Sequence, residues 1–316
     1  MRRRGFIRAI GGTALGAMAS PIALAGSDDC SRLLVLVELK GGNDGLNTVV
    51  PYADPDYYRL RPALAICRDQ VLQLDERLGL HPSLAPLMPL WQRGEMAILQ
   101  GVGYPDPSLS HCRSIEIWDT ACISGQCPPD DWLVQALGKN RLQWRSPVKS
   151  CNLVPKGAFG CAVQAACEAL AWNAGIAVIR LALDGFDTHQ NQAPRHAAIL
   201  GELAEGLSAL RAGLDQLGLW DSTLVLTQSE FGRRVAENPS AGTDHGTATV
   251  HFAFGGRVRG GLYANSPQLD KLDGNGNLLF SLDFRAIFAA VLDRWLNVPA
   301  FRMLGQRFAT ESFFAA

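Results

Sequence analysis

The chain has 316 residues, 47% of them hydrophobic, and its 29 basic and 30 acidic residues give a formal net charge of −1. This balance provides no general attraction to nucleic acid or to an anionic membrane surface, so neither is expected as a partner. The length is sufficient for one large hydrophobic core, or for a core that carries a cap.

The amino terminus has the pattern of a twin-arginine export signal. Residues 3–8 (RRGFIR) contain the arginine pair, and a small apolar stretch follows that ends in Ala-Leu-Ala at 23–25. A membrane-spanning helix needs roughly 20 strongly apolar residues, whereas this stretch is interrupted by Gly11, Gly12, Gly16 and Pro21. We therefore predict a cleaved signal peptide at 1–25, contact with the twin-arginine export machinery, a location in the periplasm or outside the cell, and no integral membrane segment after cleavage.

The remainder, residues 30–316, is predicted to be one domain built around a parallel sheet. Residues 33–39 (LLVLVEL) form a nearly continuous apolar run, which is typical of a strand buried on both faces of a parallel sheet. Four more runs with strand character lie at 97–102, 176–183, 223–227 and 250–254.

Helical patterns alternate with these strands. From about 193 to 217, leucines recur at three- and four-residue spacing and predict an amphipathic helix that covers the sheet. Another helix is expected at about 283–297. The segment 119–172 is rich in Gly, Pro and Cys and looks helical only at 159–171, so we expect a short cap or insertion there. The alternation predicts an α/β fold, a three-layer αβα sandwich with a mostly parallel central sheet.

Five short polar motifs follow predicted strands or begin predicted helices. They are GGNDG at 41–45, LSH at 109–111, GFDTH at 185–189, SEFG at 229–232 and GTDHG at 242–246. Because the carboxyl ends of parallel strands meet at one edge of a sheet, we expect these motifs to form one dispersed site.

The residue types in these motifs indicate a metal site. Asp187 with His189, and Asp244 with His245, combine carboxylate and imidazole, which suits zinc, manganese or iron. A single pair of this kind also occurs in ordinary capped turns, so the prediction depends on the whole set. The predicted ligands are Asp44, Asp187, His189, Glu230, Asp244 and His245. Their excess of carboxylates would allow a second, harder cation, and the expected cofactor is two divalent ions chosen from zinc, manganese, calcium and magnesium.

Ser110 and His111 are the predicted catalytic residues. Ser110 should begin a helix, where its hydroxyl could attack an anionic ester or could simply cap the helix, and both interpretations remain open. His111 could orient a phosphate or protonate a leaving group. The residues expected to bind substrate are Asn43, Arg113, Arg233 and Arg234. The other histidines, His81, His196 and His251, are expected to be structural: His81 near the surface at a helix start, and His196 on the polar side of the long helix.

The motifs GGNDGLN, VGYPDPSLSHCRSIEIW, GFDTHQNQ, SEFGRR and GTDHGTA, in this order after a twin-arginine leader, resemble a bacterial family known as domain of unknown function 1501. The resemblance covers roughly residues 33–266. This family is similar to the alkaline phosphatase and sulfatase superfamily, whose members use two metals and a serine, threonine or formylglycine nucleophile. The resemblance implies that Asp44 binds one metal and that Ser110 is the nucleophile. It also implies that Asp187, His189 and His245 bind the other metal, with Glu230 in the place of a strand-end aspartate.

The chain departs from the superfamily at two informative positions. Phe231 stands where a histidine ligand is frequent, and no motif for formylglycine formation surrounds Ser110, which disfavours a sulfate-ester hydrolase. We predict an exported metal-dependent hydrolase of a phosphate ester or related anionic ester, with a small or polysaccharide-derived substrate. The alternative is a non-catalytic exported binding or assembly protein that keeps a partial metal site.

Overall fold

The computed structural model describes residues 32–123, 127–138, 143–145, 157–172, 175–310 and 312–315. The export signal predicted at 1–25 lies outside this part of the chain and stays a prediction. Within the described ranges, no helix is both long enough and apolar enough to cross a membrane.

A mixed sheet of eight strands forms the centre of the molecule. Its order is β12-β5-β11-β8-β1-β7-β6, with β13 beside β5. β1 pairs in parallel with β7 and β8, and β11 runs antiparallel to both β5 and β8. The five predicted strands are confirmed to within two residues. The bounds are β1 Leu33–Lys40, β5 Met96–Gly103, β6 Gln143–Arg145, β7 Val178–Asp184, β8 Thr223–Gln228, β11 Thr249–Phe254, β12 Gly261–Tyr263 and β13 Leu282–Asp283.

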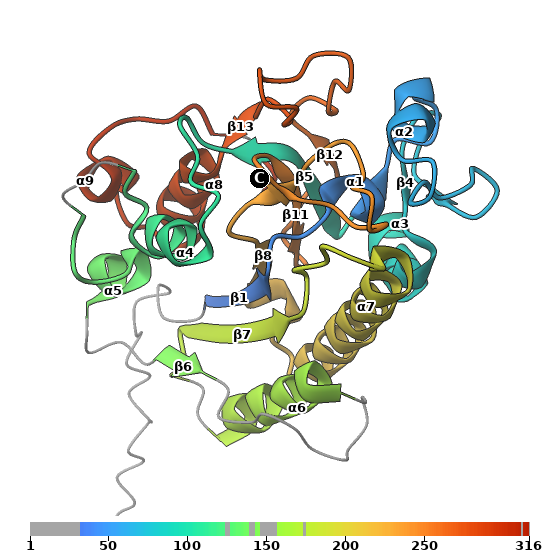
Figure 1. Ribbon diagram of the computed structural model, residues 1–316. Helices are drawn as coiled ribbons and strands as arrows, with labels where there is room; N and C mark the ends of the chain where they lie inside the picture. The colour runs from blue at the N-terminus through green and yellow to red at the C-terminus, as the bar shows by residue number, and fades with distance from the viewer. Residues whose placement is uncertain are drawn as a thin grey trace, which may run out of the picture.

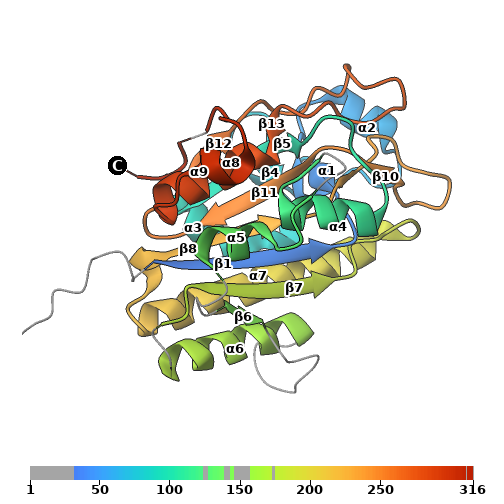
Figure 2. The ribbon, with the colours of Figure 1, turned by 90° about the vertical axis from the view of Figure 1, so that its left-hand side faces the viewer.

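Both faces of the sheet are buried, which explains the continuous apolar run of β1. Val35 and Val37 belong to one hydrophobic cluster, and Leu34 and Leu36 belong to another on the opposite face. Figures 1 and 2 show two groups of helices on opposite sides of the sheet. One group comprises η2 (Pro82–Leu87), α3 (Met88–Gln92), α6 (Gly157–Trp172) and α7 (Gln192–Gln216). The other comprises α4 (His111–Thr120), α5 (Trp132–Leu137), α8 (Phe284–Ala290), η4 (Val291–Trp295) and α9 (Ala300–Leu304).

The long helix α7 confirms the helix predicted at 193–217, but its buried stripe is longer than expected. Leu200, Leu203 and Leu207 are buried, and His196 lies one turn before them on the same stripe. His196 is only 1% exposed, so its predicted place on the polar side was wrong. His81 does begin η2, as predicted, but it is buried rather than near the surface.

The described parts of the segment 119–172 contribute to the main sheet and its helices. Strand β6 pairs in parallel with β7, and the buried face of α6 belongs to the same cluster as α7. Cys122 and Cys127 form a disulfide after α4. The cap or insertion boundaries stay a prediction.

Short elements surround the carboxyl edge of the sheet. They are α1 (Gly45–Thr48), β2 (Val49–Val50), α2 (Pro55–Leu60), β3 (Leu72–Gln73), β4 (Gly79–Leu80), β9 (Gly232–Arg233) and β10 (His245–Gly246). The short η3 (Trp220–Ser222) directly precedes β8, at the opposite edge. The antiparallel pair β9–β10 places His245 opposite Arg233. This pairing positions one predicted ligand beside the end of β8.

Candidate metal centre

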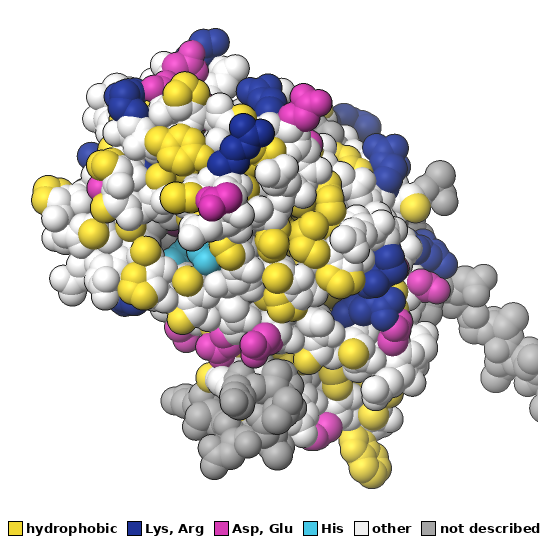
Figure 3. Space-filling model, turned by 90° about the vertical axis from the view of Figure 1, so that its right-hand side faces the viewer, with side chains coloured by type: hydrophobic (Ala, Val, Ile, Leu, Met, Phe, Trp, Pro, Cys, Tyr) yellow, Lys and Arg dark blue, Asp and Glu magenta, His cyan; other side chains and the backbone are white. Residues whose placement is uncertain are grey.

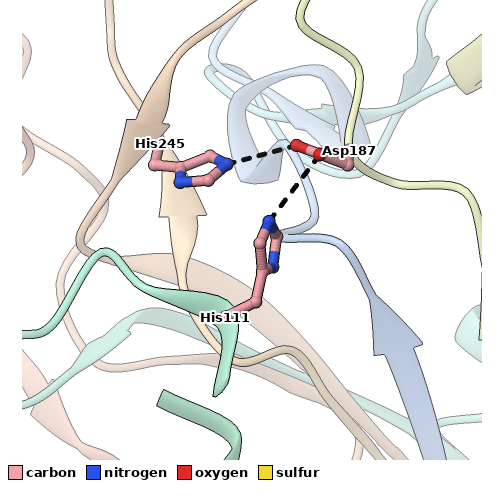
Figure 4. Close-up of side chains that lie close together, drawn as sticks. All are labelled: His111, Asp187 and His245. Atoms are coloured by element: carbon pink, nitrogen blue, oxygen red, sulfur yellow. Dashed lines mark hydrogen bonds and ion pairs between the residues drawn. The ribbon is translucent and has the colours of Figure 1, made fainter. Parts of the chain in front are cut away.

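Three side chains from separate segments converge beyond the carboxyl edge of the sheet. Asp187 follows β7, His111 begins α4, and His245 lies on β10. One donor atom from each residue lies within 4.8 Å of the other two. Figure 4 shows both imidazoles pointing toward the Asp187 carboxylate. Histidine atoms also reach the molecular surface in the view of Figure 3.

The Nε2 atoms face the carboxylate of Asp187. His111 Nε2 lies 3.7 Å from Oδ2, and His245 Nε2 lies 3.2 Å from Oδ1. His189 is a neighbour of the group, because its Nε2 is 3.0 Å from Asp187 Oδ1 and 3.0 Å from His245 Nε2. Ligands held at 2.0–2.1 Å by a tetrahedral ion lie about 3.3 Å apart, so these separations fit a divalent cation.

Each histidine has an acceptor behind it. His111 Nδ1 lies 2.8 Å from Glu230 Oε1. His189 Nδ1 lies 3.4 Å from Asp244 Oδ1, and His245 Nδ1 lies 2.9 Å from the Leu109 carbonyl oxygen. A hydrogen on Nδ1 leaves the Nε2 lone pair directed at Asp187. Histidines that bind metals are held in this way by a carboxylate or a carbonyl.

Asp187 is kept ionised by a buried arginine. Partial burial is the largest single effect and raises the pKa of this carboxyl, but Arg233, His245 and His189 together lower it to about 2. Arg233 Nη2 is 2.6 Å from Asp187 Oδ1, and the arginine is only 1% exposed. The same Nη2 also lies against the carbonyl oxygens of Gly41 and Phe186, while Nε and Nη1 donate to the carbonyl oxygens of Gly42 and Thr243. Arg233 therefore faces inward, toward Asp187 and these carbonyl oxygens, and its contact with substrate stays a prediction.

Asp44, a predicted metal ligand, is buried away from the three converging side chains. Its Oδ1 accepts the backbone N–H groups that begin α1, at 3.2 and 3.4 Å. Its Oδ2 accepts hydrogen bonds from Arg61 at 2.6 Å and from Gln192 at 2.5 Å. Burial raises the pKa of Asp44, yet the charge of Arg61 keeps it below its ordinary value. Both oxygens therefore have hydrogen-bond partners that support the turn after β1.

Glu230 and Asp244, two more predicted ligands, lie behind the histidines. Glu230 is 6% exposed, and its Oε1 accepts from Gly41 N and contacts His111. Asp244 is held by Asn238, whose hydrogen bond is the main reason that its pKa is lowered, and it contacts His189. In this structure both carboxylates orient imidazoles.

Ser110 occupies the N-cap position of α4 and is exposed. Its side chain makes no capping hydrogen bond, so capping of α4 does not explain the hydroxyl. The residues on either side are fixed, because the Leu109 carbonyl contacts His245 and the His111 ring contacts Glu230.

The three remaining predicted substrate ligands are not gathered at the centre. Asn43 is fully buried and accepts a hydrogen bond from Thr48, and its Oδ1 lies 3.1 Å from His196 Nε2. Arg113 pairs with Glu116 on the exposed side of α4. Arg234 gives its backbone N–H to the Asp244 carbonyl, and its Nε is buried without a partner.

Two supporting residues were missed by the sequence reasoning. Arg61 lies in the ordinary surface-like sequence RLR, and nothing there indicates that its side chain is fully buried against Asp44. Trp118 donates its ring N–H to the Glu230 carbonyl at 3.0 Å and stacks on His251. Trp118 lies seven residues, or two helical turns, after His111. This spacing was the only available signal that both side chains share one face of α4.

Solved structures with some similarity have low identity and low TM-scores. One is the lipoteichoic acid synthase LtaP from Listeria monocytogenes, with TM-score 0.41, 10% identity, 91% of this chain covered and 75% of that chain. Another is the C-terminal periplasmic domain of EcEptC from Escherichia coli in complex with Zn, with TM-score 0.40, 11% identity and coverage of 72% and 74%. A third is a protein in the alkaline phosphatase superfamily from Vibrio parahaemolyticus, with TM-score 0.38, 10% identity and coverage of 71% and 60%.

No curated protein is similar enough in sequence to count as a match. One known protein family matches part of this chain, a segment that contains Asp187, His189, Glu230 and His245 but not His111. This family is described as protein of unknown function (DUF1501), and residues 156–298 of the chain match it.

Proposed function

We propose that the chain is an exported metal-dependent hydrolase of a phosphate ester or a related anionic ester, with an alkaline phosphatase-like three-layer fold. The observation that carries the proposal is the orientation of the histidines: each Nδ1 faces an acceptor while the Nε2 atoms face Asp187. Three protein ligands, His111, Asp187 and His245, leave a coordination position open, as catalytic sites do. Export rests on residues 1–25 alone.

A divalent cation bound there would polarise an ester oxygen and lower the pKa of a bound hydroxyl or water. The chain supplies the geometry around it. Ser110 stands at the amino end of the ten-residue helix α4, where free backbone N–H groups favour an anionic oxygen. We assign Ser110 as the nucleophile. Direct attack by water is the alternative route for the same substrates.

His189 is proposed as a proton donor or acceptor beside the reacting ester. Its side chain is 44% exposed, the highest value among the three histidines. Its Nδ1 lies 3.4 Å from Asp244 Oδ1, and an imidazole positioned beside the ester suits proton transfer to a leaving oxygen.

Hydrolysis of phosphate monoesters and diesters by the metal-loaded chain tests the proposal. Ser110→Ala should lower kcat by at least about 1,000-fold if the serine is the nucleophile. Ser108→Ala is the matched control in the same loop and should stay within about tenfold of wild type. Full activity of Ser110→Ala would leave the hydrolase standing and assign the attack to water. Absence of hydrolysis by metal-loaded wild type would contradict the proposal.

The packing of Phe231 favours one alternative, a binding protein without hydrolytic activity. Its ring is 2% exposed and lies 4.8 Å from the His111 ring centroid and 4.5 Å from that of His245. An apolar ring therefore stands where a further ligand would be expected. A metal-loaded chain that binds phosphate, but turns over neither phosphate nor sulfate esters, would support this alternative.

A further inference from the structure

We infer that the centre holds one divalent ion, and that two buried arginines, Arg61 and Arg233, occupy the position and supply the charge of a second. This inference rests on the proposed metal-dependent function and specifies its cofactor. The family resemblance implies a second ion bound by Asp44, with Ser110 as the nucleophile and Glu230 in the place of a strand-end aspartate. The surroundings of Asp44 and Glu230 do not fit such an ion.

The first obstacle is that Asp44 has no free oxygen. Arg61 and Gln192 donate to Oδ2, and the backbone at the start of α1 donates to Oδ1. Arg61 is itself fixed, because it also donates to Asn47 Oδ1 and to the carbonyl oxygens of Val235 and Arg234. Its side chain is 0% exposed. A cation at Asp44 would have to displace a fully buried guanidinium from all of these acceptors.

The second obstacle is space. A Cβ added to Gly42 would overlap the Phe231 ring and would lie 3.4 Å from Arg233 Nε. The Phe231 ring and the Arg233 guanidinium thus fill the region between the turn after β1 and the loop after β8. Glu230, on that same loop, already uses Oε1 for Gly41 N and for His111. One remaining carboxylate oxygen is a poor ligand set for a second ion.

The charges of the two buried arginines also disfavour a second ion. Two of the four carboxylates in and around the site are paired with arginines, Asp44 with Arg61 and Asp187 with Arg233, at 2.6 Å in each case. Arginine stays protonated at every physiological pH. A second dication near Asp44 would stand close to these two permanent positive charges, and repulsion in this buried region is only weakly screened. The arginines are positioning residues, since they act through the carboxylates that they hold.

The test is the ratio of metal to protein, measured by native mass spectrometry after zinc or manganese loading and removal of excess ion. Wild type should hold one ion per chain. Asp44→Asn should also hold one ion, because asparagine can still cap α1 and Asp44 is not a ligand. The matched variant Asp187→Asn should lose the ion, with affinity lowered at least about 100-fold.

Two ions in wild type, falling to one in Asp44→Asn, would overturn this inference while leaving the metal-dependent hydrolase intact. No bound ion in wild type would overturn both. If Asp44→Asn does not fold, the wild-type stoichiometry decides alone, and X-ray absorption of the loaded protein checks it: a metal–metal distance near 4 Å would contradict a single ion.

Discussion

At the residue scale, the two carboxylates behind the histidines are not equivalent. The Glu230 side chain is 5% exposed and 2.8 Å from His111, whereas the Asp244 side chain is 53% exposed and 3.4 Å from His189. A short contact in a dry environment fixes a ring more strongly than a long contact in water. Glu230 should therefore control metal affinity more than Asp244 does.

Glu230→Gln keeps the shape of the side chain and removes its charge. We expect the affinity for zinc to fall by about 10- to 100-fold, the usual effect of losing a partner behind a metal-bound histidine. Competition with a chelator of known affinity measures the change. Asp244→Asn is the control and should weaken binding less, because Asp244 contacts His189, which is not one of the three proposed ligands. Equal effects would contradict the greater role assigned to Glu230.

Gly42 is a second residue whose substitution should lower the free energy of unfolding by a predictable amount. Its φ of +79° disfavours any other residue, and an added Cβ would meet the buried Phe231 ring. Gly42→Ala should lower the free energy of unfolding by roughly 2–4 kcal/mol, the sum of backbone strain and overpacking. Gly94 has a similar φ of +71° with open space around it. Gly94→Ala should cost only about 1 kcal/mol in the same urea titration, and two equal losses would exclude the packing contribution.

At the scale of elements, Arg61 joins three segments that are distant in the sequence. It is the C-cap residue of α2, it pairs with Asp44 at the start of α1, and it donates to Val235 after β9. Both hydrogen bonds are buried, so removal of the arginine leaves their acceptors without this donor inside the protein. The arrangement of α1, α2 and the segment after β9 therefore depends on this one side chain.

Arg61→Met tests that dependence. Breaking a buried ion pair by removing one partner costs about 3–5 kcal/mol, because the remaining charge stays buried without compensation. Arg59 lies in the same helix and pairs with Asp56 at the surface, with its side chain 65% exposed. Arg59→Met should change stability by no more than about 1 kcal/mol. Chemical unfolding of both variants gives the comparison, and a small loss for Arg61→Met would contradict the proposed role.

At the scale of the whole molecule, three buried histidines make stability depend on pH. Burial lowers the pKa values of His81, His196 and His251 from 6.5 to about 4. Around His196, Asp44 opposes this shift, whereas His81, Arg61 and Arg233 add to it. These three histidines take up protons near pH 6.5 in the unfolded chain, but only near pH 4 in the folded chain. Stability should therefore be complete above pH 6.5 and decline as the pH falls toward 4.

Urea unfolding at several pH values, with chelator present to remove metal effects, measures this decline. His251→Gln removes one of the three titrating groups, so the slope between the two pKa values should decrease by about one third. A flat profile for wild type across this window would show that these histidines are not buried in the neutral form.

The sequence predicted the framework of the fold better than the arrangement of the site. Strands such as β1 carry their own signal, because burial on both faces demands an unbroken apolar run. The carboxylates carried no such signal. Whether Asp44 faces an ion or a guanidinium depends on Arg61, a residue 17 positions away whose burial only the tertiary structure decides. The same limitation placed His196 on the wrong side of α7, since a histidine inside a leucine stripe looks polar until its neighbours are known.

The most direct test of the metal centre is a crystal structure of the zinc-loaded protein with anomalous scattering at the zinc edge. We predict one strong peak about 2.0–2.2 Å from His111 Nε2, His245 Nε2 and an Asp187 carboxylate oxygen. Stoichiometric zinc at any other place, with these three side chains uncoordinated, would contradict the account.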